Sequence, residues 1–286
     1  MGQRVRRFVV KSKRVMGIAI GHDEIVGIKA YKIEGTIVLE DVIVQKRHSN
    51  KGTDVKEFFD YYGEVGISIG CVFESPLQSV YMETPMMHKI DQYLFAHREG
   101  KRIFQNEDFP NAIDFASRPG TTEELMCMLI VALERKQVKQ VAQGIQQGGG
   151  DLRVIDYWPA PLAFSRGRES SMLCITPEED KVQVSLWNDK FCTAHTLVSL
   201  DVNEVLEACK TVYEDSKQFQ VPYPKGAIVV GFDETRSKAF ESILETYGTI
   251  DQVPLHIVDK GEDYNPQNIN HEMAFGLAIR LLADGK

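Results

Sequence analysis

The chain has 286 residues, of which 43% are hydrophobic and 26% charged, an ordinary composition for a globular protein. Its net charge of −8 argues against a nucleic-acid-binding protein, which would usually present a basic face. No apolar run approaches the roughly 20 residues that span a bilayer, and the N-terminus lacks the apolar core of a signal peptide, so we expect a soluble cytoplasmic protein.

Cysteine and histidine usage gives no sign of a disulfide framework or of a metal centre. The five cysteines are odd in number and lie at no metal-ligand spacing, and the seven histidines are scattered. We therefore expect reduced thiols and no bound metal.

The N-terminus differs in charge from the rest of the chain. Its first fourteen residues carry six basic side chains and no acidic one. They are interpreted as a solvated terminus, with weak attraction to anionic lipid head groups as the alternative.

The first half opens with strands, which short apolar runs predict near residues 14–20, 25–32 and 36–45. A helix is expected at about 55–62, because its apolar residues recur at three- and four-residue spacing.

Later in this half, residues 126–133 are all apolar, which is typical of a strand buried on both faces. A helix at about 136–146 follows and ends at a run of three glycines. A strand at 152–157 and a short helix after Pro159 complete the half.

The second half repeats this order. Its expected elements are strands near 172–176, 181–187 and 191–198, a helix at 202–219, a strand at 227–231, a helix at 235–247, a strand at 255–258 and a helix at 272–283. Each half thus runs through three strands, a helix, a strand, a helix, a strand and a helix. This predicts an α/β protein with two similar lobes, each built on a mixed sheet flanked by helices.

One segment interrupts the repeat in the first half. Residues 66–72 alternate as a strand and 78–83 return after a turn at Ser75-Pro76, which predicts a β-hairpin followed by an amphipathic helix at 86–96. The matching place in the second half has no insertion. The predicted domains are lobe one at 1–63 and 124–165, an inserted subdomain at 64–123 and lobe two at 166–286.

Six segments, in order, resemble the elements of one family. They are M-G-I-A-I-G-H-D-E-I-V-G-I-K, G-I-S-I-G-C-V-F-E-S-P-L-Q-S-V-Y-M-E-T-P-M-M-H-K-I-D, L-I-V-A-L-E-R-K-Q-V-K-Q-V-A-Q-G-I-Q-Q-G-G-G-D-L-R-V-I-D-Y-W-P-A-P-L-A, V-Q-V-S-L-W-N-D-K-F, A-I-V-V-G-F-D-E-T and H-E-M-A-F-G-L-A-I-R. Over nearly its whole length the chain resembles the actin-like ATPases, and among them the PilM family of type IV pilus assembly proteins. The resemblance implies an actin-like (RNase H-like) two-lobe fold with duplicated βββαβαβα halves and an inserted subdomain in lobe one.

The chain departs from the family at its nucleotide site. Ala19 stands where the first phosphate hairpin has an acid for the metal ion, and the second hairpin turn carries three acids at 178–180 in place of a glycine turn. Such acids would repel a triphosphate. A Gly-Gly pair that contacts adenosine in the family is Gly231-Phe232 here, and the lobe-two insertion that roofs the pocket is missing.

These departures predict a pseudo-ATPase with no catalytic residues, for which ATP and magnesium are disfavoured as cofactors. The degenerate pocket positions are Ala19, Gly21, His22, Thr176, Gly231 and Phe232.

The resemblance also implies a partner. In the family, a groove between the inserted subdomain and lobe one receives a cytoplasmic peptide of the membrane protein PilN. The candidate partner-binding residues are Tyr81, Met82, Met86 and Met87, because methionines beside an aromatic side chain can form an adaptable surface. Packing beneath the hairpin is the alternative role for these four residues. The leading hypothesis is a cytoplasmic scaffold, peripheral at the inner membrane, that binds a PilN-like tail.

Two other functions stay open at this point. The chain could be a working actin-like ATPase or small-molecule kinase with unusual ligands. It could also be the cytoplasmic actin-like domain of a type II secretion assembly protein. That family normally continues into a membrane span, and this sequence ends at Lys286 without one, so we rank it lower.

Overall fold

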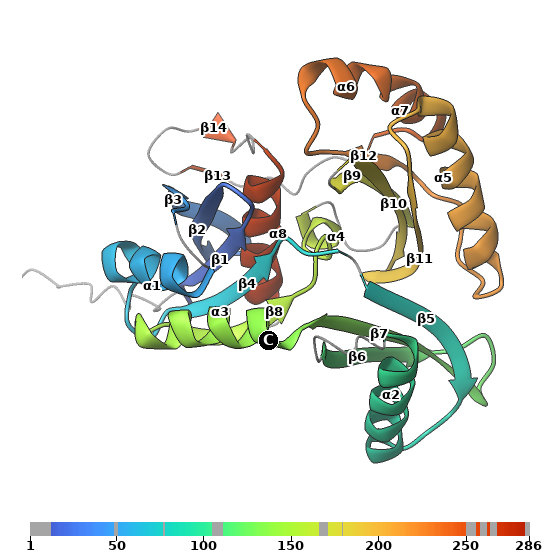
Figure 1. The fold of residues 1–286 in the computed structure, drawn as a ribbon, viewed down its shortest axis with the longest axis horizontal. Coiled ribbons are helices and arrows are strands. Elements are labelled where there is room, and N and C mark those ends of the chain that lie inside the picture. Colours follow the sequence, from blue (N-terminus) through green and yellow to red (C-terminus); the bar gives the residue numbers. More distant parts are fainter. Residues whose placement is uncertain are drawn as a thin grey trace, which may run out of the picture.

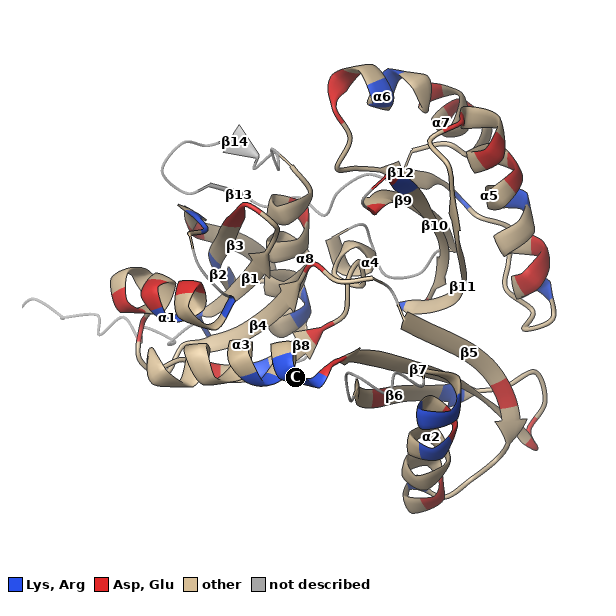
Figure 2. Ribbon diagram, viewed as in Figure 1, with Lys and Arg blue, Asp and Glu red and all other residues tan. Residues whose placement is uncertain are grey.

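The computed structural model describes residues 13–48, 51–76, 78–104, 111–165, 171–178, 180–249, 256–257, 262–263 and 268–283 (Figure 1). These residues form a seven-stranded, a four-stranded and a three-stranded sheet, which correspond to lobe one, lobe two and an inserted subdomain. The predicted α/β, two-lobe architecture is confirmed. Many of the charged residues lie on the outer helices (Figure 2).

Lobe one is built on a sheet of order β14-β13-β3-β2-β1-β4-β8. Its main strands are β1 (Val15–Ile20), β2 (Glu24–Ile33), β3 (Thr36–Lys46), β4 (Ser68–Phe73) and β8 (Asp151–Asp156). The first three pair antiparallel as a meander, while β1, β4 and β8 run parallel. The helices α1 (Lys51–Tyr62) and α3 (Arg135–Gln147) cover one face, and α8 (Ile269–Ala283) covers the other.

Strand β1 is buried on both faces, as its apolar sequence requires. Met16 and Ile18 face α1 and α3, whereas Val15 and Ala19 face α8. Gly17 lets α8 lie directly on the strand, since a side chain there would clash with the backbone carbonyl of Ala274.

Lobe two has a sheet of order β11-β10-β9-β12. Its elements are β9 (Met172–Glu178), β10 (Lys181–Asn188), β11 (Phe191–Val198), α5 (Val202–Lys217), β12 (Ala227–Val229), α6 (Glu234–Ala239) and α7 (Glu241–Tyr247). The side chain of Asp201 caps α5 by accepting hydrogen bonds from the amides of Asn203 and Glu204. The single helix expected at 235–247 is instead the two helices α6 and α7.

The inserted subdomain is an antiparallel sheet of order β5-β7-β6 with one helix on it. It comprises β5 (Gln78–Pro85), α2 (Lys89–Ile103), β6 (Asn111–Pro119) and β7 (Leu125–Glu134). Met126, Met128 and Ile130 of β7 pack under α2. The short helix α4 (Leu162–Ser165) leads from lobe one toward lobe two.

Two strands lie in other sheets than predicted. The hairpin of 66–72 with 78–83 is wrong, because β4 pairs with β1 and β8 while β5 pairs with β7. The apolar strand predicted in lobe one at 126–133 is β7 of the subdomain. The subdomain sheet therefore spans 78–134, whereas the predicted subdomain was 64–123. The sequence does not distinguish the two assignments of this strand, because an apolar run can be buried equally well under α2 or under α3.

The chain end also lies elsewhere than predicted. Of the strand expected at 255–258, β13 (His256–Ile257) is described, and it pairs with β3 of lobe one and with β14 (Glu262–Asp263). The last helix packs on β1, β2 and β4 rather than on lobe two. Its side chains are buried on nearly every side, which requires a site between other elements.

The basic N-terminus is described only from residue 13, so Arg4, Arg6, Arg7 and Lys11 lie outside the described residues. Arg14 forms ion pairs with Glu40 and Glu64. None of the helices in the described ranges is long and apolar enough to cross a membrane.

Candidate functional site

A cavity of about 610 Å³ lies between the lobes, and we call it the inter-lobe cleft. Its walls are the β1–β2 turn, the segment after β12 and the start of α8, represented by His22, Asp233 and Asn270. A neighbouring cavity of about 300 Å³ joins the same turn to Pro177 and Glu178 of lobe two. The fold therefore brings together the two turns that sequence analysis identified as degenerate phosphate hairpins.

Four of the six predicted pocket positions line these cavities, namely Gly21, His22, Gly231 and Phe232. The other two do not. Ala19 is fully buried in the core beneath α8, and Thr176 is fully buried in β9.

The inter-lobe cleft is acidic. Its acidic lining residues are Asp23, Glu24, Glu74, Asp233 and Glu272, and no Lys or Arg is among the described residues that line it. A nucleoside triphosphate carries several negative charges, so this lining opposes its entry.

The two cations of the smaller cavity hold the protein's own backbone. Arg47 donates hydrogen bonds from Nη1 to the carbonyl oxygens of Gly21 and His22, at 2.7 and 3.0 Å, and its Nε pairs with Asp54. Lys51 donates from Nζ to the Glu74 carbonyl at 3.0 Å. Burial and the nearby Arg47 lower the pKa of Lys51. Both side chains are thus hydrogen-bonded to backbone carbonyls of the β1–β2 turn and of the segment after β4.

Protein atoms also fill the space next to the key glycines. The Asn270 side chain lies against Gly21, and Glu24 Oε1 accepts a hydrogen bond from Asn270 Nδ2 at 3.1 Å. Gly231 has φ +87° and lies so close to Pro177 that a Cβ would come within 2.8 Å of the proline Cδ. The residues present fit a magnesium triphosphate poorly. Within the described residues, no cluster of three or more His, Cys, Asp or Glu could hold a metal ion.

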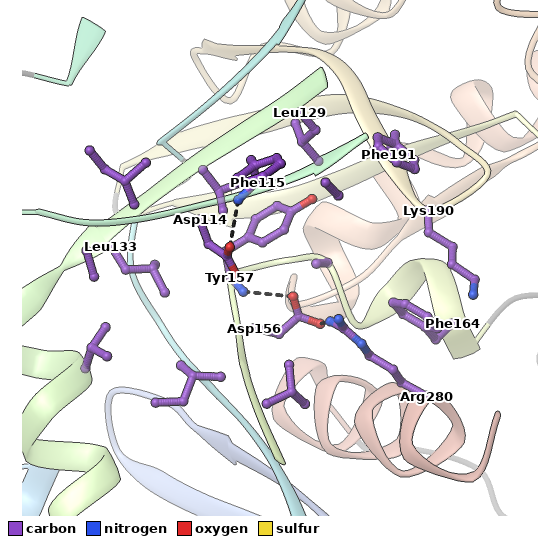
Figure 3. Close-up of a pocket in the computed structure, with 18 residues that line it drawn as sticks. Asp114, Phe115, Leu129, Leu133, Asp156, Tyr157, Phe164, Lys190, Phe191 and Arg280 are labelled. Carbon is purple, nitrogen blue, oxygen red and sulfur yellow. Dashed lines mark hydrogen bonds and ion pairs between the residues drawn. The ribbon is translucent and has the colours of Figure 1, made fainter. Parts of the chain in front are cut away.

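A third cavity, of about 520 Å³, lies between the inserted subdomain and lobe one (Figure 3). We call it the apolar groove. One wall is the inner face of the subdomain sheet, where the strand register places Ala112, Asp114 and Ala116 of β6 opposite Leu133, Val131 and Leu129 of β7. The other wall is formed by Val138 of α3, by residues 154–157 at the end of β8 and by α4.

One end of the apolar groove is polar (Figure 3). Asp156, only 4% exposed, forms an ion pair with Arg280 of α8. The Arg280 guanidinium lies 5.1 Å from the centre of the Phe164 ring, and the Lys190 ammonium lies 4.8 Å from it. The groove thus combines apolar walls with two cations at one end.

The predicted partner-binding residues lie outside this groove. Tyr81 is 8% exposed and packs against Phe219 and Phe191 of lobe two, with ring centroids 4.7 and 6.1 Å apart. Burial raises its pKa, and its hydroxyl accepts a hydrogen bond from Arg118.

The methionines support the packing alternative. Met82 and Met87 pack into the subdomain core under α2, and only Met86 is largely exposed, at 54%. The sequence analysis did not identify the residues that line the groove. Its signal was present in β7, where Leu129, Val131 and Leu133 alternate with residues that face α2. That signal was interpreted as a strand of lobe one.

Helix α8 links the inter-lobe cleft and the apolar groove. Its first residues, among them Asn270, line the inter-lobe cleft, and Arg280, ten residues later, lines the apolar groove. The helix is held between them by close backbone contacts at Gly17 and Gly276.

No protein-family model matches this sequence, and neither does any curated protein. Among solved structures, a chain of the PilM-PilN type IV pilus biogenesis complex superposes with a TM-score of 0.64 at 13% identity, covering 94% of this chain and 98% of that one. A Bacteroides thetaiotaomicron protein described as having an actin-like ATPase fold and unknown function gives a TM-score of 0.50 at 8% identity, covering 96% and 99%. This chain has the actin-like ATPase fold. The fold class that the sequence predicted is therefore confirmed.

Proposed function

We propose that this protein is a PilM-like scaffold of a type IV pilus or related machine. It binds the cytoplasmic tail of a PilN-like inner-membrane protein in the apolar groove and carries out no nucleotide chemistry. The observation that carries the proposal is the groove itself. It lies between the inserted subdomain and lobe one, where the resemblance to the PilM family implies a peptide-binding site.

The chemistry of the groove suits a short peptide. Its volume falls within the roughly 300–1,000 Å³ of typical ligand sites. Its walls are mostly aliphatic, and Asp156, Lys190 and Arg280 lie at one end. Burying apolar side chains of a tail against such walls would supply affinity, while the polar end would orient the tail.

The acidic inter-lobe cleft supports the second half of the proposal. Five acids line it, and in the smaller cavity beside it Arg47 and Lys51 donate hydrogen bonds to backbone carbonyls. A working ATPase or kinase with unusual ligands is the competing function, and the cleft's volume of about 610 Å³ is the observation in its favour.

Peptide binding tests the proposal directly. Overlapping 12-residue peptides from the cytoplasmic segments of single-span inner-membrane proteins would be screened on an array, and hits measured by fluorescence anisotropy. We expect saturable binding by one family of tails. Absence of binding at high micromolar concentration would contradict the proposed function.

A groove variant locates the site. Val131→Asp places a charge on the subdomain wall, opposite Asp114 in the register, and should weaken binding at least about tenfold. The matched control is Val44→Asp, which makes the same change at an exposed strand residue far from the groove and should leave binding unchanged. Equal losses in both variants would place the peptide elsewhere.

A further inference from the structure

Two strand edges open onto the apolar groove. Strand β6 has β7 on one side and, within the described part of the chain, no strand on the other, and β8 is likewise the last strand of its sheet. Each gives consecutive residues to the groove, 112–116 from β6 and 154–156 from β8, and Tyr157 follows directly after β8. Because side chains alternate along a strand, consecutive lining residues mean that main chain is exposed there. Ile113 and Phe115 support this, since their side chains pack with the residues under α2.

An aspartate covers one amide on β6 and another directly after the end of β8 (Figure 3). The Phe115 N–H donates a hydrogen bond to Asp114 Oδ1 at 2.8 Å, and the Tyr157 N–H donates one to Asp156 Oδ1 at 3.1 Å. In a paired strand, a carbonyl of the neighbour would accept such bonds. Asp156 is buried and paired with Arg280, whereas Asp114 is exposed and can move away at little cost.

We propose that the occupant of the apolar groove is an extended peptide that pairs with the open edge of β6 as a fourth strand of the subdomain sheet. A peptide carbonyl replaces the Asp114 carboxylate at the Phe115 amide. This inference rests on the proposed function, because it names how the tail is held. Main-chain hydrogen bonds supply binding in this arrangement, and alternate side chains face the lobe-one wall around Val138 and Val154.

The groove also defines the peptide's composition. Alternate apolar residues match its aliphatic walls, and a carboxylate matches its polar end, where the Lys190 ammonium lies 4.8 Å from the centre of the Phe164 ring. Asp114 acts as a cover for the edge when the groove is empty, in the way that charged residues protect exposed strand edges from unwanted pairing.

Backbone-modified peptides test the pairing without altering the protein. The strongest tail from the array would be synthesised with a single N-methylated amide at each position in turn. We expect about tenfold weaker binding at every second position in its central part and little change at those between, because each affected amide loses one hydrogen bond. Binding that is insensitive to N-methylation, or a loss repeating every three to four residues, would overturn the strand pairing while leaving groove binding intact. A failure of every tail to bind would instead refute the proposed function, and this inference with it.

Two substitutions of Asp114 test its role as a cover. Asp114→Ala uncovers the Phe115 amide and should tighten binding about threefold, whereas Asp114→Asn keeps a carbonyl oxygen at the same place and should bind as the natural protein does. Equal tightening by both variants would mean that charge rather than amide capping is responsible, and would overturn this part of the proposal.

Discussion

The inter-lobe cleft and the apolar groove are similar in volume, about 610 and 520 Å³, but opposite in chemistry. The cleft is lined by the β1–β2 turn, by the segment after β12 and by the start of α8, and its walls are acidic. The two cations of the smaller cavity beside it hold backbone carbonyls. The groove has no counterpart in the duplicated halves, because the inserted subdomain creates it. The two sites therefore differ in the charges and the open strand edges of their linings, and not in their volume.

The largest expected effect involves the helix that both cavities share. Gly17→Ala would push α8 away from β1, because the new Cβ meets backbone that cannot give way, and should cost about 3 kcal/mol of unfolding free energy in urea titrations. The matched control is Gly70→Ala in the neighbouring strand, where Gly70 is the register partner of Gly17.

At Gly70 the nearest atoms are side-chain carbons, with Val154 Cγ1 at 3.2 Å, which can shift. We expect that variant to cost only about 1 kcal/mol. Equal costs for the two variants would mean that α8 is not seated on β1 as described, and the two cavities would then not share a rigid wall.

Nucleotide titration addresses the cleft. Isothermal titration with Mg-ATP should give no saturable heat up to about 1 mM, which corresponds to a binding free energy weaker than about −4 kcal/mol. The groove peptide serves as the positive control in the same preparation. Micromolar binding of Mg-ATP would favour the competing ATPase or kinase function.

A smaller effect is expected at the joint between the subdomain and lobe two. Arg118 donates from Nε to Tyr81 Oη at 2.7 Å, pairs with Asp189 at 3.2 Å and lies 5.1 Å from the centre of the Phe191 ring. Arg118→Ala should cost about 1–2 kcal/mol of stability, measured by urea unfolding.

The same variant should weaken peptide binding about threefold, because Phe191 lines the groove and loses its support. Arg153→Ala removes an exposed ion pair with Asp151 and should change stability by less than about 0.5 kcal/mol. If the two variants behave alike, Arg118 does not support the groove.

The smallest expected effect is a pH dependence of stability, which arises at the joint between the subdomain and lobe two. Burial lowers the pKa of His195, although its ring Nε2 is hydrogen-bonded to the Ser79 carbonyl at 3.1 Å. The unfolded chain therefore binds a proton more readily than the folded one. Stability should be fully present above the ordinary histidine pKa of about 6.5 and decline as pH falls below it. The decline, followed by urea unfolding between pH 7.5 and 5.5, should shrink in His195→Gln and persist in a variant of the exposed His22. An unchanged decline in His195→Gln would contradict this assignment.

Sequence patterns predicted elements well where each element carries its own signal. The strands β1, β2 and β3 and the order of elements from β9 to β12 were predicted from apolar periodicity. Of the predicted pocket positions, Gly21, His22, Gly231 and Phe232 line the cavities between the lobes. For Ala19 and Thr176, the pattern did not reveal that both side chains point into cores.

The partner site shows the opposite case. Tyr81, Met82 and Met87 had the composition of a binding surface, but neighbours distant in sequence bury them. The groove is instead formed by β6, β7, β8 and α8, which are separated by up to about 170 residues. No local pattern can signal a cavity whose walls meet only after folding.

The sequence alone determined the α/β class and the duplicated order of elements, because apolar periodicity is a local property. Tertiary structure decided which sheet each apolar strand joins, where α8 packs and which strand edges remain open. The physical reason is that an apolar strand gains similar free energy from any apolar face, so only the packing of the whole chain determines which face buries it.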